Sequence, residues 1–212
     1  MKISYAIPVC TEHAELEKLL LFLTKHIDTE DEIVVQCDQG NTTLEVYKVI
    51  DSFQFAPVGF EDPIKVIEFP LNADFASFKN NLKEHCTGDW IFQIDADELP
   101  TYYLINNLKE ILKANPTTDL FLVPRINTVK GITEEHIKKW NWNVDERGWV
   151  NFPDYQTRVV QNNSKIKWAS KVHEVLVGHE KYALLPQEEE WSLYHHKHID
   201  KQEFQNKFYS NI

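Results

Sequence analysis

The chain has 212 residues, enough for one hydrophobic core with a small appended subdomain, and its formal net charge is -11. This acidic balance argues against a nucleic-acid partner or an anionic membrane surface, because both normally demand a basic face, and a bound polyphosphate would need a bridging cation. The three cysteines lack metal-ligand spacing, and there is neither an export signal nor an apolar run of about 20 residues. The sequence therefore predicts a reduced, cytoplasmic protein with no transmembrane segment.

Strand and helix patterns alternate through the first half of the chain. Apolar runs predict strands, and apolar residues at helical spacing predict helices, in the order 3–9 (strand), 12–26 (helix), 32–37 (strand), 44–53 (helix), 64–69 (strand) and 75–85 (helix). For the first helix, Thr11 is the predicted N-cap and Glu15 lies in the first turn. This alternation predicts an α/β fold with a doubly wound, mostly parallel sheet.

The next apolar run ends abruptly in three carboxylates. Residues 90–94 read Trp-Ile-Phe-Gln-Ile, which predicts a central strand covered on both faces, and Asp95, Asp97 and Glu98 follow it. If the extended backbone persists, Asp95 and Asp97 leave the same face and can hold one cation or one hydrogen-bond network. Such hard oxygens suit Mg²⁺ or Mn²⁺, which usually keep positions open for substrate phosphates. The alternative is an acidic turn that caps the next helix.

The second half of the chain begins regularly and then loses its periodicity. A helix is predicted at 102–114 and a strand at 119–124, but residues 125–151 form a long excursion. Its tryptophans suit either stacking on a sugar or covering the edge of the sheet. Short strands are predicted at 155–161 and within 165–177, and a helix in the tail through Phe204 and Phe208.

Polar residues follow three of the predicted strands, at Pro8 to Glu12, Asp38 to Thr42, and Asp95 to Glu98. Neighbouring strand ends of a doubly wound sheet converge on one crevice, which is where ligands bind in such folds. The coincidence of the three segments therefore predicts a ligand site there.

The ordered set of motifs resembles family 2 glycosyltransferases of the GT-A fold. The match is carried by Ile7-Pro8-Val9 with Glu12, the turn at Asp38, residues 72–80, Gly88-Asp89-Trp90, and Asp95-Ala96-Asp97-Glu98, which corresponds to the DxD motif. Residues 148–158, Trp168 and Val172-His173-Glu174 are similar to the bacterial and phage branch of lipopolysaccharide core glucosyltransferase-like proteins. The resemblance implies one domain over 1–212, with a nucleotide-sugar-binding half at 1–124 and an acceptor-side half with a C-terminal helix at 125–212.

The resemblance also implies residue roles on the donor side. The donor is a nucleotide-sugar, with UDP as the favoured nucleotide; Asp38 accepts hydrogen bonds from its base, and the residues that line it are Pro8, Val9, Glu12 and Ala96. Asp97, assisted by Asp95, holds Mn²⁺ or Mg²⁺ on the diphosphate. His195 follows the strand-like residues 191–194 and adds a metal ligand or a phosphate donor, with His196 as its rival. Lys79 and Arg158 are candidates to pair with a phosphate or a carboxylate.

The sequence specifies the acceptor and the catalytic base less closely than the donor site. A glycan or lipid-linked glycan in polysaccharide biosynthesis is the implied acceptor, and its hydroxyl needs a base. Glu174 is the first candidate and Asp154 the second, and either suits an acceptor-orienting or surface acid equally. Many family members carry a Glu-Asp motif here, where this chain has Val172-His173-Glu174. The family resemblance implies inversion at the anomeric centre, with a β product from an α-linked donor.

Other classes of function remain open at this point. A metal-dependent nucleotidyltransferase also uses paired aspartates, but it should show a Gly- and Lys-rich triphosphate loop, which Pro8 to Glu12 lacks. A non-catalytic nucleotide- or sugar-binding module predicts binding that is indifferent to Mn²⁺ and to loss of Asp97. A purely structural protein would bind no nucleotide.

Overall fold

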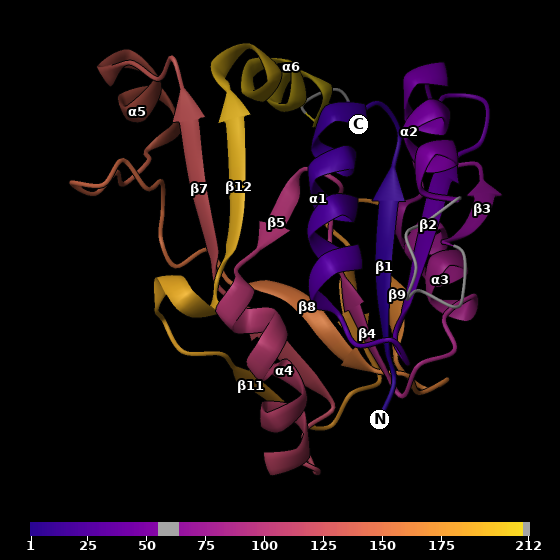
Figure 1. Ribbon diagram of the computed structural model, residues 1–212. Coiled ribbons are helices and arrows are strands. Elements are labelled where there is room, and N and C mark those ends of the chain that lie inside the picture. The colour runs from indigo at the N-terminus through magenta and orange to yellow at the C-terminus, as the bar shows by residue number, and fades with distance from the viewer. Residues whose placement is uncertain (55–63, 210–212) are drawn as a thin grey trace.

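A computed structural model describes residues 1–54 and 64–209 of the chain. Within this part a seven-stranded sheet lies between helices, with a three-stranded sheet and a two-stranded ribbon beside it (Figure 1). The elements of the first half are β1 (Ile3–Val9), α1 (His13–His26), β2 (Glu32–Asp38), α2 (Leu44–Gln54), β3 (Lys65–Phe69), α3 (Phe75–Glu84), β4 (Trp90–Gln93), β5 (Glu98–Pro100) and α4 (Tyr102–Ala114). Those of the second half are β6 (Leu120–Val123), β7 (Arg125–Lys130), α5 (Glu134–Trp140), β8 (Gln156–Gln161), β9 (Lys167–Ala169), β10 (Val175–Val177), β11 (Tyr182–Leu184), the 3₁₀ turn η1 (Glu189–Trp191), β12 (Leu193–His198) and α6 (Ile199–Tyr209).

The central sheet confirms the predicted fold class. Its strand order is β11-β6-β8-β4-β1-β2-β3, and β4 lies in its middle with all four residues buried. β1 pairs in parallel with both β2 and β4, and β2 with β3. Only β8 runs against its neighbours, β4 and β6. The sheet is therefore mostly parallel and doubly wound, as the alternation of strands and helices predicted.

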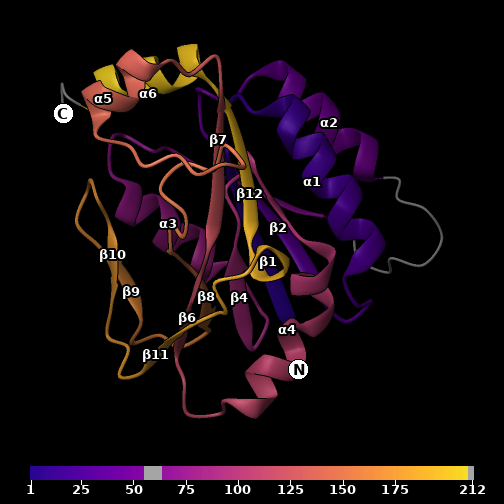
Figure 2. The same ribbon diagram turned by 90° about the vertical axis from the view of Figure 1, so that its left-hand side faces the viewer.

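Successive side chains of β1 point to opposite faces of this sheet, and both faces are buried. Ile3, Tyr5 and Ile7 pack in a core with α1, α2 and α4, whereas Ala6 packs in a second core with α3 and the β9–β10 ribbon. Figure 2 shows these two groups on opposite sides of the sheet. Burial on both faces explains why the inner strands are almost wholly apolar.

The helix predictions are confirmed except for one cap. α4 begins and ends at the predicted residues, and the Thr101 hydroxyl caps it by accepting a hydrogen bond from the Leu104 N–H. The prediction of Thr11 as the N-cap of α1 is wrong, because Glu12 is the N-cap residue. Its carboxylate accepts hydrogen bonds from the N–H groups of Cys10, at 3.2 Å, and Thr11, at 2.9 Å, and so fixes the turn that leaves β1.

The excursion that begins at Arg125 contributes β7 to a second sheet, in the order β5-β12-β7. β12 pairs in parallel with β7 and antiparallel with β5, and the two long strands rise beside α5 and α6 in Figure 1. The rings of Trp140 and Trp142 lie 4.7 Å apart and pack against Val129, Val150 and Ile199. Trp149 is buried, and Trp140 and Trp142 are half-buried. Of the two interpretations of these tryptophans, the structure supports the packing one.

Candidate active site

A pocket of about 500 Å³ opens at the carboxyl ends of β1, β2 and β4. It brings together ten of the predicted site residues: Pro8, Val9, Glu12, Asp38, Lys79, Asp95, Ala96, Asp97, Glu174 and His195. Asp154, Arg158 and His196 do not line it. The predicted convergence of three strand ends is therefore observed.

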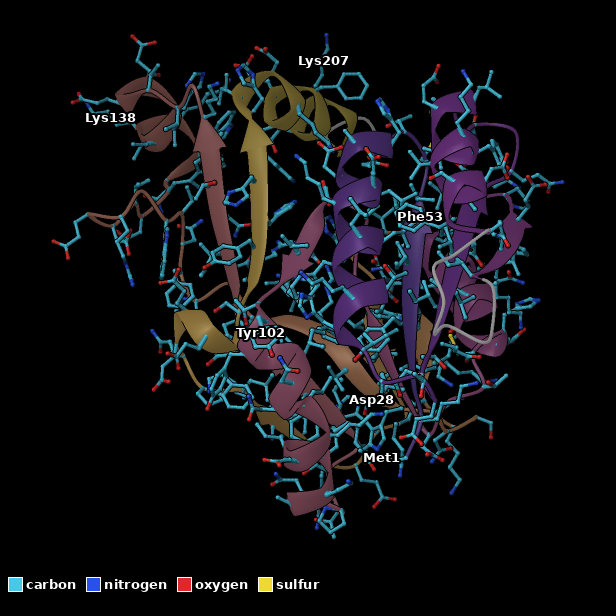
Figure 3. The ribbon with its side chains drawn as sticks, in the orientation of Figure 1. Met1, Asp28, Phe53, Tyr102, Lys138 and Lys207 are labelled. Carbon is cyan, nitrogen blue, oxygen red and sulfur yellow. The ribbon has the colours of Figure 1, made fainter. Side chains whose placement is uncertain are left out.

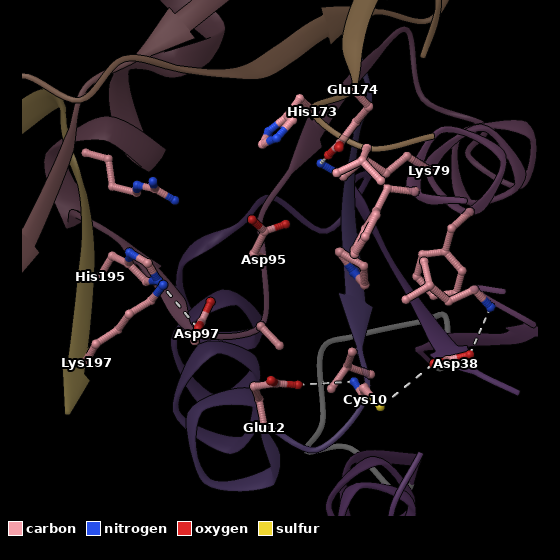
Figure 4. A pocket seen from close by; sticks show the side chains of 18 of the residues that line it. Cys10, Glu12, Asp38, Lys79, Asp95, Asp97, His173, Glu174, His195 and Lys197 are labelled. Atoms are coloured by element: carbon pink, nitrogen blue, oxygen red, sulfur yellow. Dashed lines mark hydrogen bonds and ion pairs between the residues drawn. The ribbon is translucent and has the colours of Figure 1, made fainter. Parts of the chain in front are cut away.

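Asp38 stands at one end of the pocket, and Asp97 with His195 at the opposite end (Figure 4). Asp38 ends β2 and is buried, and its two oxygens accept hydrogen bonds from the Leu71 N–H at 2.9 Å and the Asn41 amide at 3.1 Å. The side chain is thus held in one orientation. Phe75 and Phe78 line the same pocket, so the polar group lies among apolar walls.

The backbone through the three carboxylates does not stay extended as expected. It turns at Ala96 and Asp97, with the Glu98 N–H donating to the Asp95 carbonyl at 2.8 Å. The turn is needed because β4 belongs to the central sheet whereas β5 pairs with β12 in the second sheet. Both Asp95 and Asp97 still line the pocket, but by way of a turn rather than by strand alternation.

Asp97 is surrounded by positive groups. Its Oδ2 lies 3.4 Å from His195 Nε2 and 3.1 Å from the Lys201 ammonium nitrogen. Burial alone would raise the pKa of Asp97, but the hydrogen bond from His195 and the charges of His195 and Lys201 hold it well below its usual range. The other ring nitrogen of His195, Nδ1, lies 2.7 Å from the Asn127 amide oxygen. With Nδ1–H donating to that oxygen, Nε2 is the atom presented to Asp97.

This donor set fits a divalent cation. Asp97 already attracts one cationic group, the Lys201 ammonium, and a carboxylate with an imidazole orientated by a second residue is a common pair of ligands. Over residues 1–54 and 64–209, no group of three or more His, Cys, Asp or Glu side chains is placed to hold a metal. A cation held here would therefore take its remaining ligands from substrate and water.

Arg158 lies beneath Asp95 and not in the pocket. Its side chain is 4% exposed, and one nitrogen, Nη2, lies 2.5 Å from Asp95 Oδ2 and 2.7 Å from Glu98 Oε1. Burial raises the pKa of Asp95, but Arg158 and Lys79 together hold it below its ordinary value. The sequence predicts either a phosphate or a carboxylate as the partner of Arg158, and in the structure its partners are carboxylates.

Asp154, the second candidate base, does not line the pocket and is held by other side chains. Its Oδ2 accepts from Arg125 at 2.6 and 2.9 Å and from the Asn127 amide at 2.8 Å, and its Oδ1 accepts from Gln156. Burial alone would raise the pKa of Asp154, but Arg125 and Asn127 lower it below the usual value. A carboxylate with these partners is a poor proton acceptor.

Glu174, the first candidate base, lies in the pocket and forms an ion pair with Lys79 through Oε1. Lys79 is itself fixed, because its ammonium lies 4.5 Å from the centre of the Trp168 ring. The preceding residue, His173, has a left-handed backbone with φ of 55°, which turns the 172–174 segment toward the pocket wall (Figure 4). Glu174 and His173 lie on a third side of the pocket, beyond Asp95.

The structure separates the two rival histidines. His195 lies inside β12, not after a strand as expected, since residues 189–191 form the 3₁₀ turn. His196 points to the other face of β12, where it meets Thr128 and stacks on Tyr194. His195 therefore enters the pocket, and His196 does not.

Three basic residues of the site are not among those that the sequence predicts. Arg125 and Lys197 line the pocket, and Lys201 reaches Asp97 from α6. For Lys197 a signal was present: in an extended strand it shares a face with Leu193 and His195, and Leu193 is apolar. Arg125 and Lys201 carry no such signal, since a charged residue at a strand end or on a helix normally faces solvent.

Comparisons with known proteins give one family. A sequence model described as glycosyl transferase family 2 matches residues 4–172. S. aureus TarS in complex with UDP-GlcNAc aligns with a TM-score of 0.63 and 14% identity, over 93% of this chain and 59% of that one. TarS in complex with UDP aligns with a TM-score of 0.62 and 13% identity, over 92% of this chain and 60% of that one. The chain thus spans about 60% of the length of these TarS chains, and at this identity the likeness shows the fold alone.

No protein among the curated sequences matches the chain. No helix in the described part of the chain is long and apolar enough to cross a membrane.

Proposed function

The chain belongs to glycosyl transferase family 2 and has the GT-A fold, and from this premise we propose that it is an inverting, metal-dependent glycosyltransferase. It moves a sugar, of the hexosyl class, from a UDP-sugar to a hydroxyl of a glycan or lipid-linked glycan. The observation that carries the proposal is the pocket itself, which has a fixed carboxylate at one end, an Asp97–His195 pair at the other and Glu174 on a third side.

The donor lies along the pocket with its base at Asp38. Asp38 accepts hydrogen bonds from the base, and the backbone and side chains of Pro8, Val9 and Ala96 line the nucleotide. UDP as the nucleotide is supported by TarS, which has been crystallised with UDP and with UDP-GlcNAc. Membership of the lipopolysaccharide core branch stays a prediction.

Asp97 and His195 are the proposed ligands of a divalent cation, Mn²⁺ or Mg²⁺, with Asp95 assisting. When bound, the cation supplies Lewis-acid stabilisation of the charge on the departing diphosphate. Asn127 fixes the tautomer and orientation of His195, and Arg158 fixes Asp95 from below. Because it is buried with two carboxylates, Arg158 is a positioning residue and makes no contact with phosphate in this proposal.

Glu174 is the proposed base. The acceptor oxygen attacks the anomeric carbon opposite the diphosphate, the bond from that carbon to the diphosphate oxygen breaks, and its electron pair leaves with UDP. The hydroxyl proton passes to the Glu174 carboxylate, whose other oxygen is held by Lys79. Attack from the opposite face inverts the anomeric centre. Asp154 is not retained as a base, because Arg125, Asn127 and Gln156 occupy its carboxylate.

The two halves of the chain divide this work in the proposal. Residues 1–124 supply Asp38, Asp95 and Asp97 and bind the donor, whereas residues 125–212 supply Glu174 and His195 and face the acceptor. We propose one domain, because the second sheet joins β5 from the first half to β7 and β12 from the second.

Titration calorimetry tests the proposal. We expect UDP to bind in the presence of Mn²⁺ and to bind far more weakly with a chelator, and GDP and CDP to bind less well. Asp97→Ala should weaken Mn²⁺-dependent UDP binding at least about 100-fold. Even the loss of a residue that only hydrogen-bonds to a metal ligand lowers metal affinity about 10–100-fold. The matched control is Asp51→Ala, which removes an exposed carboxylate from α2 and should leave binding unchanged.

Two results would contradict the proposal. UDP binding that is indifferent to both Mn²⁺ and Asp97 would favour a non-catalytic binding module. Absence of binding of any of the three nucleotides would favour a structural protein.

A further inference from the structure

The Lys201 ammonium lies against two carboxylates that belong to different strand ends of the pocket. It is 3.1 Å from Asp97 Oδ2 and 3.5 Å from Glu12 Oε1, and its side chain is about one-third exposed. A lysine ammonium is a cation at neutral pH, and here it faces the negative charges of both Asp97 and Glu12. Lys201 thus bridges the turn after β1 and the turn after β4 from a helix near the end of the chain.

The oxygen that Lys201 uses is the one that also faces His195. Asp97 Oδ2 is the atom 3.4 Å from His195 Nε2, and the Lys201 nitrogen approaches this same atom. A divalent cation held by Asp97 and His195 would bring two further positive charges to that oxygen. Two cations at one carboxylate oxygen repel each other, so the ammonium and the metal compete for it.

The helix that carries Lys201 has two apolar residues among its described side chains, and one of them packs against the rest of the protein. Ile199, at its start, packs against the second sheet, but Phe204 is 71% exposed. A further, partly exposed contact joins the Glu203 carboxylate of α6 to the His136 ring of α5 at 3.4 Å. Exposed ion pairs contribute about 0–1 kcal/mol each, so this contact adds little to the attachment of α6.

We propose that Lys201 exchanges partners during donor binding: it neutralises Asp97 in the free protein, gives up that oxygen to the divalent cation, and then pairs with the diphosphate of the bound nucleotide. The inference rests on the proposed function and adds a residue of α6 to it. In the free protein Lys201 is a competitor of the metal, and in the loaded protein it is a ligand of the donor. The two roles predict opposite effects of removing the charge.

The test is Lys201→Met, examined by two calorimetric titrations. Mn²⁺ titrated alone should bind on the order of fivefold more tightly to the variant than to the native protein, the size expected when a partly exposed ion pair no longer has to be broken. UDP titrated at saturating Mn²⁺ should bind about tenfold more weakly, because a charge-assisted hydrogen bond to the diphosphate is lost. A lysine that merely supported the fold would change both affinities in the same direction.

Two further variants serve as controls. Lys201→Arg keeps the charge and should leave Mn²⁺ binding as weak as in the native protein. Lys207→Met removes the same charge from the same helix, but Lys207 is exposed and points away from the body of the protein (Figure 3), so both affinities should stay unchanged.

The inference is overturned if Lys201→Met leaves Mn²⁺ binding unchanged or weaker, or if it leaves UDP binding undiminished. Either result, obtained while Asp97→Ala still abolishes Mn²⁺-dependent UDP binding, leaves the proposed function standing. If Asp97→Ala has no effect on Mn²⁺ or UDP binding, the proposed function fails together with the inference.

Discussion

Replacement of Arg158 by methionine tests the claim that this arginine supports the site from within the protein. Methionine keeps much of the length and apolar volume of the side chain but removes the charge. Two buried contacts are lost, at 2.5 Å to Asp95 and at 2.7 Å to Glu98. We expect the folded state to lose stability because two carboxylates are left close together without their shared partner.

The size of this loss of stability depends on the contacts that the two carboxylates keep in the variant. Removing one partner of a buried ion pair costs about 3–5 kcal/mol. Glu98 keeps a contact at 2.9 Å to Arg125, and Asp95 is partly exposed, so we expect the lower end, about 3 kcal/mol. With a urea dependence of about 3 kcal/mol per molar for a chain of this size, the unfolding midpoint should fall by about 1 M.

The loss of stability should depend on pH with a definite sign. In the native protein the pKa of Asp95 is lowered, so its ionic contacts stabilise the folded state above the unfolded pKa of about 3.9 and are lost as the pH falls through the lower, native pKa. Without Arg158 the folded-state pKa of Asp95 rises. The difference in unfolding free energy between the two proteins should therefore be largest near pH 7 and shrink as the pH approaches 4 and below.

Urea unfolding of both proteins at pH 7 and pH 4 measures these quantities. Arg147→Met is the control, since Arg147 is half exposed and pairs with Asp145 on the surface beside the Trp149 ring, contacts worth about 1 kcal/mol together. If Arg158→Met costs no more than this control, or if its cost grows toward acid pH, the reasoning about the buried arginine is wrong.

Two further predictions concern the proposed metal ligands and the proposed base. Asn127→Ala should weaken Mn²⁺ binding about 10–100-fold in calorimetry, because Asn127 holds His195 Nδ1, whereas Asn106→Ala, which changes an exposed amide on α4, should not. Unchanged Mn²⁺ affinity in Asn127→Ala would remove Asn127 from the proposal. Glu174→Gln should lower the rate of UDP release from the UDP-sugar about 10²–10⁴-fold and leave UDP affinity within about twofold, because it removes the base and keeps the shape of the side chain. A full rate in this variant would assign the base elsewhere.

The central sheet was predictable because its signals are local. Apolar runs and helical spacing each lie within ten to fifteen residues, and both faces of β1 and β4 are buried, so the pattern of Ile3 to Val9 and of Trp90 to Ile94 is unambiguous. The convergence of Asp38 and Asp97 follows from the same argument, since parallel strands bring their carboxyl ends to one edge.

The second sheet was not predictable because its central strand carries an unusual sequence. Leu193 to His198 reads Leu-Tyr-His-His-Lys-His, which has one strongly apolar residue and no clean alternation. The strand expected at 191–194 therefore lies too early in the chain, and no local pattern around Asp154, the predicted base, indicates that Arg125 falls beside it. Contacts between residues far apart in the chain, such as Arg158 with Asp95, leave no trace in local spacing.

The register of the second sheet decides which histidine enters the site. In β12, His195 lies directly opposite Glu98 of β5 on one side and Asn127 of β7 on the other, so these three residues form one row across the sheet. Residues opposite each other on neighbouring strands point to the same face, which places His195 between its partner Asn127 and the turn that carries Asp97. A shift of one residue would turn His195 outward and bring His196 inward. The order of the two adjacent histidines in the chain does not decide which of them enters the site. Pairing between strands that lie about 100 residues apart in the sequence decides it.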